Sequence, residues 1–129
     1  MPGHYNHAKI LEVLVVEDDA LLRMAAVDLV ELENLVVFDA DGADQALELL
    51  ALHSQIGIVF TDIQMPGSMD GMVLAQHTKA RWPHLQHIIV SGQLAPTKAQ
   101  MPDGAQFFAK PYDTGLKGQT LRAMAGIQV

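Results

Sequence analysis

Residues 56–71 read IGIVFTDIQMPGSMDG, and this stretch holds one strand of the predicted fold, its loop and the start of the next helix. The run 56–61 is apolar on both of its alternating faces, which is typical of a strand buried in a parallel sheet. Pro66 and Gly67 then turn the chain, and a helix is predicted over 71–82, where Pro83 ends it. Asp62 stands where the buried strand ends. Most single carboxylates in loops are simply solvated, so the role of Asp62 has to be inferred together with other residues of the chain.

The same alternation of apolar runs and amphipathic stretches recurs along the whole chain. The other predicted strands cover 11–16, 35–39, 87–91 and 105–109, and the other predicted helices cover 20–32, 42–52 and 113–126. Strands that are apolar on both faces and separated by helices indicate a parallel sheet with helices on each side. We therefore predict an α/β, doubly wound (βα)5 domain.

The stretch 20–32 divides into two faces on a helical wheel. The predicted buried face comprises Leu22, Ala25, Ala26 and Leu29. The predicted opposite face comprises Arg23, Asp28 and Glu31. Asp19 is the predicted N-cap of this helix, because a side-chain oxygen there can accept from the first free backbone N–H groups. Met24 and Val27 fall on the more polar side, where they either pack half-buried or form an apolar patch for a partner.

The segment after Ser91 departs from this regular alternation. Residues 92–104 read GQLAPTKAQMPDG and contain Pro96 and Pro102. A proline in a helix interior removes a hydrogen bond and clashes with the preceding turn. We therefore expect a short turn or an irregular loop in place of the fourth helix.

Length and composition narrow the possible classes of protein. The chain has 129 residues, which is enough for one ordinary domain. Its formal net charge is −7, and it has no cluster of Lys or Arg, so direct binding to nucleic acid is not expected. Its longest apolar runs fall far short of the roughly 20 residues that cross a bilayer. Residues 1–9 lack the apolar core of a signal peptide, and there is no cysteine. We expect a cytoplasmic protein without membrane insertion, with an N-terminal extension over 1–9 and one domain over 10–129.

Charged and polar side chains follow four of the predicted strands. Glu17 and Asp18 follow the first strand, Asp62 the third, Ser91 the fourth and Lys110 the fifth. In doubly wound sheets ligands bind beyond the carboxyl ends of the strands, where the strand order reverses. If the order is 2-1-3-4-5, the three carboxylates share one cleft, and their mutual repulsion favours a bound divalent cation such as Mg²⁺.

Each of these residues alone has an ordinary explanation, as a solvated loop acid, a helix cap or a surface lysine. Their joint occurrence at four strand ends favours a site for phosphoryl chemistry. Asp62 would then be the nucleophile that accepts the phosphoryl group, with Lys110 neutralising charge on its oxygens and Ser91 donating a hydrogen bond.

Four stretches carry a resemblance to a known family. They are VLVVEDDALLR (13–23), FTDIQMPGSMDG (60–71), IIVSGQ (88–93) and FFAKPY (107–112). Together, and in this order, they resemble the signature blocks of the response-regulator receiver domain of bacterial two-component systems. The resemblance covers roughly residues 10–127 and implies a flavodoxin-like fold. With its irregular fourth helix the chain resembles stand-alone receivers, and no output domain is expected.

The resemblance also assigns a role to each site residue. Asp62 is the implied phosphoacceptor, which takes the phosphoryl group from the phosphohistidine of a histidine kinase or phosphotransfer protein. Glu17 and Asp18 are the implied acidic pair, and they hold Mg²⁺ together with Asp62 and the main-chain carbonyl of Gln64.

The implied switch consists of Ser91, which turns towards the phosphoryl group, Lys110 as its ion-pair partner, and the aromatic Phe107. Phe107 lacks a tyrosine hydroxyl, so any signal from it depends on ring packing. The signal would reach a downstream partner protein by conformational change.

Two other functions remain open from the sequence. A pseudo-receiver would keep the fold as a protein-binding module without phosphorylation, and the missing fourth helix leaves this alternative open. An aspartyl-phosphate phosphatase would use a similar set of groups. That class places its nucleophile on the first strand and a second acid two residues later, whereas this chain has Gln64 two residues after Asp62.

Overall fold

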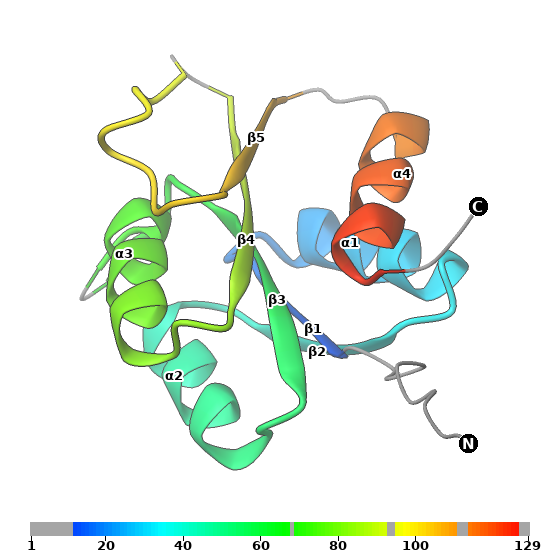
Figure 1. The fold of residues 1–129 in the computed structure, drawn as a ribbon, viewed down its shortest axis with the longest axis horizontal. Helices are drawn as coiled ribbons and strands as arrows, with labels where there is room; N and C mark the ends of the chain where they lie inside the picture. Colours follow the sequence, from blue (N-terminus) through cyan, green and yellow to red (C-terminus); the bar gives the residue numbers. More distant parts are fainter. Residues whose placement is uncertain (1–11, 68, 93–94, 111–113, 127–129) are drawn as a thin grey trace.

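The computed structural model describes residues 12–67, 69–92, 95–110 and 114–126, and these residues form a five-stranded parallel sheet in the order β2-β1-β3-β4-β5 (Figure 1). The strands are β1 (Glu12–Val16), β2 (Val36–Ala40), β3 (Ile56–Asp62), β4 (Gln86–Ser91) and β5 (Gln106–Ala109). The helices are α1 (Ala20–Leu32), α2 (Ala43–Leu52), α3 (Gly71–Arg81) and α4 (Thr114–Met124). The predicted fold class and strand order are therefore confirmed, and the predicted element ends differ by at most two residues. The proposed N-terminal extension lies outside the described residues.

Helices cover both faces of the sheet. In Figure 1, α2 and α3 lie on one side of the strands, and α1 and α4 lie on the other. Neighbouring residues of β1 alternate between two cores, because successive side chains of a strand point to opposite faces. Val13 and Val15 pack in the core beneath α1 and α4, and Leu14 and Val16 pack in the core beneath α2 and α3. Every residue of β3 is buried, as its apolar sequence predicted.

Helix α1 begins as predicted and buries part of the predicted face, since Ala26 and Leu29 are buried. Asp19 caps it by accepting from the backbone N–H groups of Leu21 and Leu22, at 2.9 and 3.0 Å. Leu22 is 46% exposed and Ala25 is also exposed, so the predicted buried face is wrong at these two positions. The buried residues of α1 are Ala26, Leu29 and Val30. Helix α1 begins at Ala20, beyond the carboxyl end of β1 at Val16.

The segment that replaces the fourth helix is irregular. No helix occurs between β4 and β5 among the described residues 95–104, as the two prolines predicted. Its backbone bonds are short-range: the N–H of Gln100 donates to the carbonyl of Thr97 at 3.0 Å, and that of Met101 to the carbonyl of Lys98 at 3.3 Å. Most of its side chains are exposed. Two positions of the predicted 92–104 segment, 93 and 94, lie outside the described residues.

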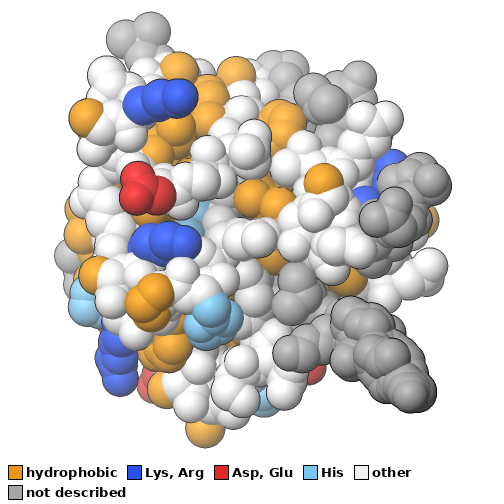
Figure 2. Space-filling view, in the orientation of Figure 1, with side chains coloured by type: hydrophobic (Ala, Val, Ile, Leu, Met, Phe, Trp, Pro, Cys, Tyr) orange, Lys and Arg blue, Asp and Glu red, His pale blue; other side chains and the backbone are white. Residues whose placement is uncertain are grey.

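On the face shown in Figure 2, the Lys and Arg side chains of the described residues do not form one continuous patch, and an acidic side chain lies between two of them. Among the helices that the structure describes, none has the length and the apolar character needed to cross a membrane.

Candidate functional site

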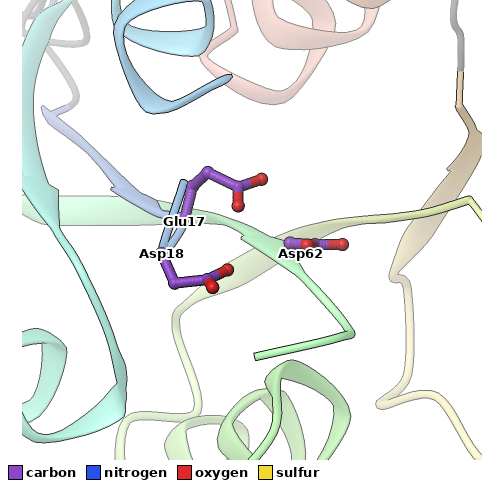
Figure 3. Close-up of side chains that lie close together, drawn as sticks. All are labelled: Glu17, Asp18 and Asp62. Atoms are coloured by element: carbon purple, nitrogen blue, oxygen red, sulfur yellow. The ribbon is translucent and has the colours of Figure 1, made fainter. Parts of the chain in front are cut away.

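The order of the strands brings the three predicted acidic residues together. β1 and β3 are neighbours with Val16 opposite Thr61, so the residues that follow these positions meet at the carboxyl edge of the sheet. Glu17, Asp18 and Asp62 each offer a carboxylate oxygen, and these oxygens lie within 4.8 Å of one another. Figure 3 shows the side chains of Glu17 and Asp18 extending from the end of β1 towards Asp62. Such close carboxylates repel one another unless cations or protons neutralise them.

Glu17 is buried and held from two sides. Its Oε2 accepts from the backbone N–H of Asp19 at 3.1 Å, and its Oε1 lies 3.4 Å from the Nζ atom of Lys110. Burial raises the pKa of the Glu17 carboxyl above its ordinary value, and the nearby Asp62 adds to this effect. The Asp19 N–H group and Lys110 act in the opposite direction. Negative charge at this position is therefore costly, and further positive charge would stabilise it.

Asp62 is the last residue of β3 and is also buried. Its backbone is fixed because the following N–H, of Ile63, donates to the carbonyl of Val90 in β4 at 3.0 Å. The side chain is only half satisfied. Oδ2 lies 3.2 Å from the Nζ atom of Lys110, whereas Oδ1 is buried without a hydrogen-bond partner. A buried carboxylate oxygen without a partner is rare in a structural role and is free to form a bond with a ligand.

Lys110 supplies the positive charge that faces these acids. It follows β5, and its backbone N–H donates to the carbonyl of Ser91 at 2.8 Å, which ties the ends of β4 and β5 together. Burial opposes the charged ammonium group, but the carboxylates of Asp62 and Glu17 outweigh this effect and raise the pKa of Lys110 above its ordinary value. Lys110 is therefore a permanent cation in contact with two carboxylates.

The donors at this site fit a hard divalent cation. Three carboxylates provide oxygen ligands, and Asp18 is exposed, so waters can complete the coordination that Mg²⁺ prefers. The buried Oδ1 atom of Asp62, which has no partner in the protein, fits a ligand from outside the chain. Gln64 lies in the loop directly after β3, and the role of its main-chain carbonyl as a ligand stays a prediction.

The two predicted switch residues lie in neighbouring strands. Ser91 ends β4, is fully buried, and donates from Oγ to Oε1 of Gln64 at 2.9 Å. Phe107 lies opposite Ile89 in the ladder between β4 and β5 and is partly buried. Phe108 packs against the core beneath α1 and α4, so Phe107 faces the side of α2 and α3. A movement of either residue stays a prediction.

Arg23 was predicted on the face of α1 opposite Ala26 and Leu29, and its side chain returns to the loop that precedes the helix. Its side chain is 22% exposed, and Nη1 donates to the main-chain carbonyl of Glu17 at 2.8 Å, while Nε lies 3.2 Å from Oδ2 of Asp39. Helical side chains tilt towards the N-terminus, so a long side chain near the start of α1 returns over the preceding loop. Arg23 therefore fixes the turn that presents the acidic pair.

Gly71 lies close against the backbone of Asp62, and the sequence did not predict this contact. Its N–H donates to the carbonyl of Ile63 at 2.8 Å, and an added Cβ atom would lie only 1.7 Å from the carbonyl oxygen of Asp62. No other residue fits this position without moving the backbone of Asp62. The sequence contains one signal for this helix start. Asp70 occupies the N-cap position of α3, where it accepts from the N–H of Val73 at 2.9 Å.

Apolar side chains surround the acids on the side of α1. A cavity of about 300 Å³ opens there, lined by Val16, Glu17, Leu22, Ala26, Phe60, Asp62, Val90 and Lys110. Outside it, Leu21 and Met24 at the start of α1 are 77% and 62% exposed. Val27 packs against the core, which confirms half-buried packing for this residue. We call Leu21, Leu22 and Met24 the apolar start of α1.

Comparison with known proteins identifies relatives of this chain. Residues 13–116 match the response regulator receiver domain family. The chain is 33% identical over 105 residues to the response regulator protein FleR of Pseudomonas aeruginosa, and 31% identical over 116 residues to the sensor kinase CckA of Brucella abortus. These alignments cover 79% and 87% of this chain, but it spans only 22% and 12% of the two relatives. A response regulator receiver protein of Pseudomonas putida has the same fold, with a TM-score of 0.77 and 28% identity, over 88% of this chain and 96% of that one.

Proposed function

Because the chain belongs to the response regulator receiver domain family, we propose that it accepts a phosphoryl group on Asp62 from the phosphohistidine of a sensor histidine kinase or a phosphotransfer protein. One observation supports this proposal most directly. Asp62 is buried, its Oδ2 lies 3.2 Å from Lys110, its Oδ1 has no partner, and two more carboxylates lie beside it. A buried aspartate with a purely structural role normally has a hydrogen-bond partner for each carboxylate oxygen.

In the proposed reaction, Oδ1 of Asp62 attacks the phosphorus atom. A new P–O bond forms as the P–N bond to the donor imidazole breaks, and the electron pair leaves with the imidazole nitrogen. Lys110 offsets charge on the phosphoryl oxygens while it keeps its proton, and most of the catalysis comes from positioning and electrostatics. Glu17, Asp18, Asp62 and the carbonyl of Gln64 would hold Mg²⁺, which supplies positive charge to the phosphoryl oxygens when bound.

The apolar start of α1 is the surface where we expect the phosphodonor protein to dock. Its exposed apolar side chains lie beside the acidic site. A cluster of exposed apolar side chains next to a functional site favours contact with a partner protein. The histidine of the partner must come within bonding distance of Asp62, so a contact next to the site positions the donor.

The proposed function predicts a measurable covalent change. After incubation with Mg²⁺ and a small acyl phosphate, intact mass should show one added phosphoryl group, lost when Mg²⁺ is removed or in Asp62→Asn. Asp70→Asn is the matched control, because Asp70 lies in the same loop, is exposed and only caps α3. A wild-type chain that gains no mass from the acyl phosphate or from a purified histidine kinase would favour a pseudo-receiver instead. Continued turnover of an external phosphate ester would favour a phosphatase.

A further inference from the structure

The Gln64 side chain connects the ends of β3 and β4 beside the phosphoacceptor. The Ser91 hydroxyl donates to Oε1 of Gln64 at 2.9 Å. Ser91 is fully buried at the end of β4, whereas Gln64 is exposed in the loop that follows β3. One partner of this hydrogen bond is therefore fixed in the core, and the other can swing into solvent.

The main chain of Ser91 cannot contribute much to a movement of the hydroxyl. Ser91 pairs with Ala109 in the ladder between β4 and β5, and its carbonyl accepts from the N–H of Lys110 at 2.8 Å. A change in the direction of the hydroxyl is therefore a rotation about χ1, and a serine side chain has three staggered rotamers.

The hydroxyl of Ser91 carries a single proton. That proton is directed at Oε1 of Gln64, and Oδ1 of Asp62 has no hydrogen-bond partner. A phosphoryl group on Asp62 would bring charged acceptor oxygens, to which a hydroxyl bonds more strongly than to a neutral amide. The amide and the phosphoryl group then compete for one donor.

We propose that the Gln64 side chain is a latch, which holds the Ser91 hydroxyl in one rotamer in the unphosphorylated protein and must release it when Asp62 is phosphorylated. The role of the release rests on the proposed function, whereas the latch itself is a property of the unphosphorylated chain. By favouring the resting rotamer, Gln64 lowers the population in which Ser91 is available to a phosphoryl group. Gln64 is a positioning residue, because it acts through Ser91.

The first test measures the Ser91 rotamer without any phosphoryl group. Three-bond couplings of Ser91 in nuclear magnetic resonance give its χ1 populations in wild type and in Gln64→Met, which has similar length but lacks the acceptor. We expect one dominant rotamer in wild type and a mixture in Gln64→Met. Gln76→Met is the matched control, since Gln76 is exposed on α3 and its amide donates to the carbonyl of Gln100 instead. Unchanged populations in Gln64→Met would overturn the latch.

The second test measures release with beryllofluoride, a mimic of the phosphoryl group, in the presence of Mg²⁺. Loss of one net hydrogen bond in the resting state should lower the half-saturating concentration by about two- to tenfold in Gln64→Met. In the Ser91→Ala background the same substitution should have no effect, because the residue through which the latch acts is absent. An equal gain in both backgrounds would show that Gln64 acts without Ser91 and would overturn the coupling.

The two tests separate the latch from the proposed function. If wild type binds no beryllofluoride, the proposed function fails, and the χ1 populations still decide whether Gln64 holds Ser91. If beryllofluoride binds and the rotamer of Gln64→Met is unchanged, the proposed function stands and the latch is wrong.

Discussion

His87 is a buried histidine that should make the stability of this protein depend on pH. It lies in β4, is 1% exposed, and its Nε2 is 2.9 Å from Oγ1 of Thr78 on α3. The Thr78 hydroxyl donates to the carbonyl of Leu74 at 2.9 Å, so Nε2 of a neutral imidazole donates to Thr78. Burial, and then the charge of Lys79, lower the pKa of His87 from 6.5 to about 4.

The difference between the pKa values of His87 in the folded and unfolded states fixes the sign and the size of the change in stability with pH. The unfolded chain binds a proton at His87 below about pH 6.5, whereas the folded chain stays neutral down to about pH 4. Since the unfolded state binds more protons in this window, stability falls as the pH falls through it. Between pH 7 and pH 5 the loss from His87 alone amounts to about 2 kcal/mol.

Urea unfolding, followed by the fluorescence of the single tryptophan, Trp82, measures this loss. The loss of stability between pH 7 and pH 5 is compared between wild type and His87→Gln. The other titrating groups contribute equally in the two proteins, so the difference reports on His87 alone. Glutamine keeps an amide donor for Thr78 but does not titrate, so we expect it to lose about 2 kcal/mol less than wild type on acidification. The control is His77→Gln, at an exposed position of α3, which should behave like wild type. Equal losses in wild type and His87→Gln would refute the reasoning.

Three further predictions concern the surface and the starts of α1 and α3. Met24→Asp should slow transfer from a histidine kinase, because it places a charge in the proposed apolar contact, and leave phosphorylation by an acyl phosphate unchanged. Leu32→Asp, at the exposed far end of α1, should change neither rate, and equal slowing with both phosphodonors in Met24→Asp would contradict docking there. Gly71→Ala should displace the acceptor backbone and slow phosphorylation by an acyl phosphate, whereas Gly42→Ala, whose added Cβ has no atom within 4 Å, should not. A normal rate in Gly71→Ala would show that the backbone yields without affecting the site. Asp19→Ala removes both N-cap hydrogen bonds of α1 and should lower the free energy of unfolding by about 1 kcal/mol in urea titrations, while Asp19→Asn, which keeps an acceptor, should lose less.

The fold could be predicted from the sequence because its strongest signals are local. The stretch 56–61 is apolar on both faces, and a strand of this kind is typical of a parallel sheet between two layers of helices. The two prolines in 92–104 excluded a regular helix there, and Asp19 marked the start of α1. Once the strand order was predicted, the proximity of Glu17 and Asp62 followed, because the ends of neighbouring parallel strands meet.

The errors arose where a contact depends on elements far apart in the chain. A helical wheel assumes a neighbour along the whole helix, but α1 extends past the end of β1, so Leu22 and Ala25 are exposed. The direction of Arg23 and the contact between Gln64 and Ser91 depend on rotamers that are selected by other loops. Sequence periodicity contains no information on such rotamers.

The irregular segment 95–104 has a consequence for how this protein can change during evolution. It is held mainly by bonds between its own neighbours, and most of its side chains face solvent. Substitutions there remove little buried apolar area, so they cost little stability. Selection can therefore alter this surface without disturbing the acids and the lysine at the strand ends. In this chain, the segment that tolerates substitution is distinct from the strand ends that hold the acids and the lysine.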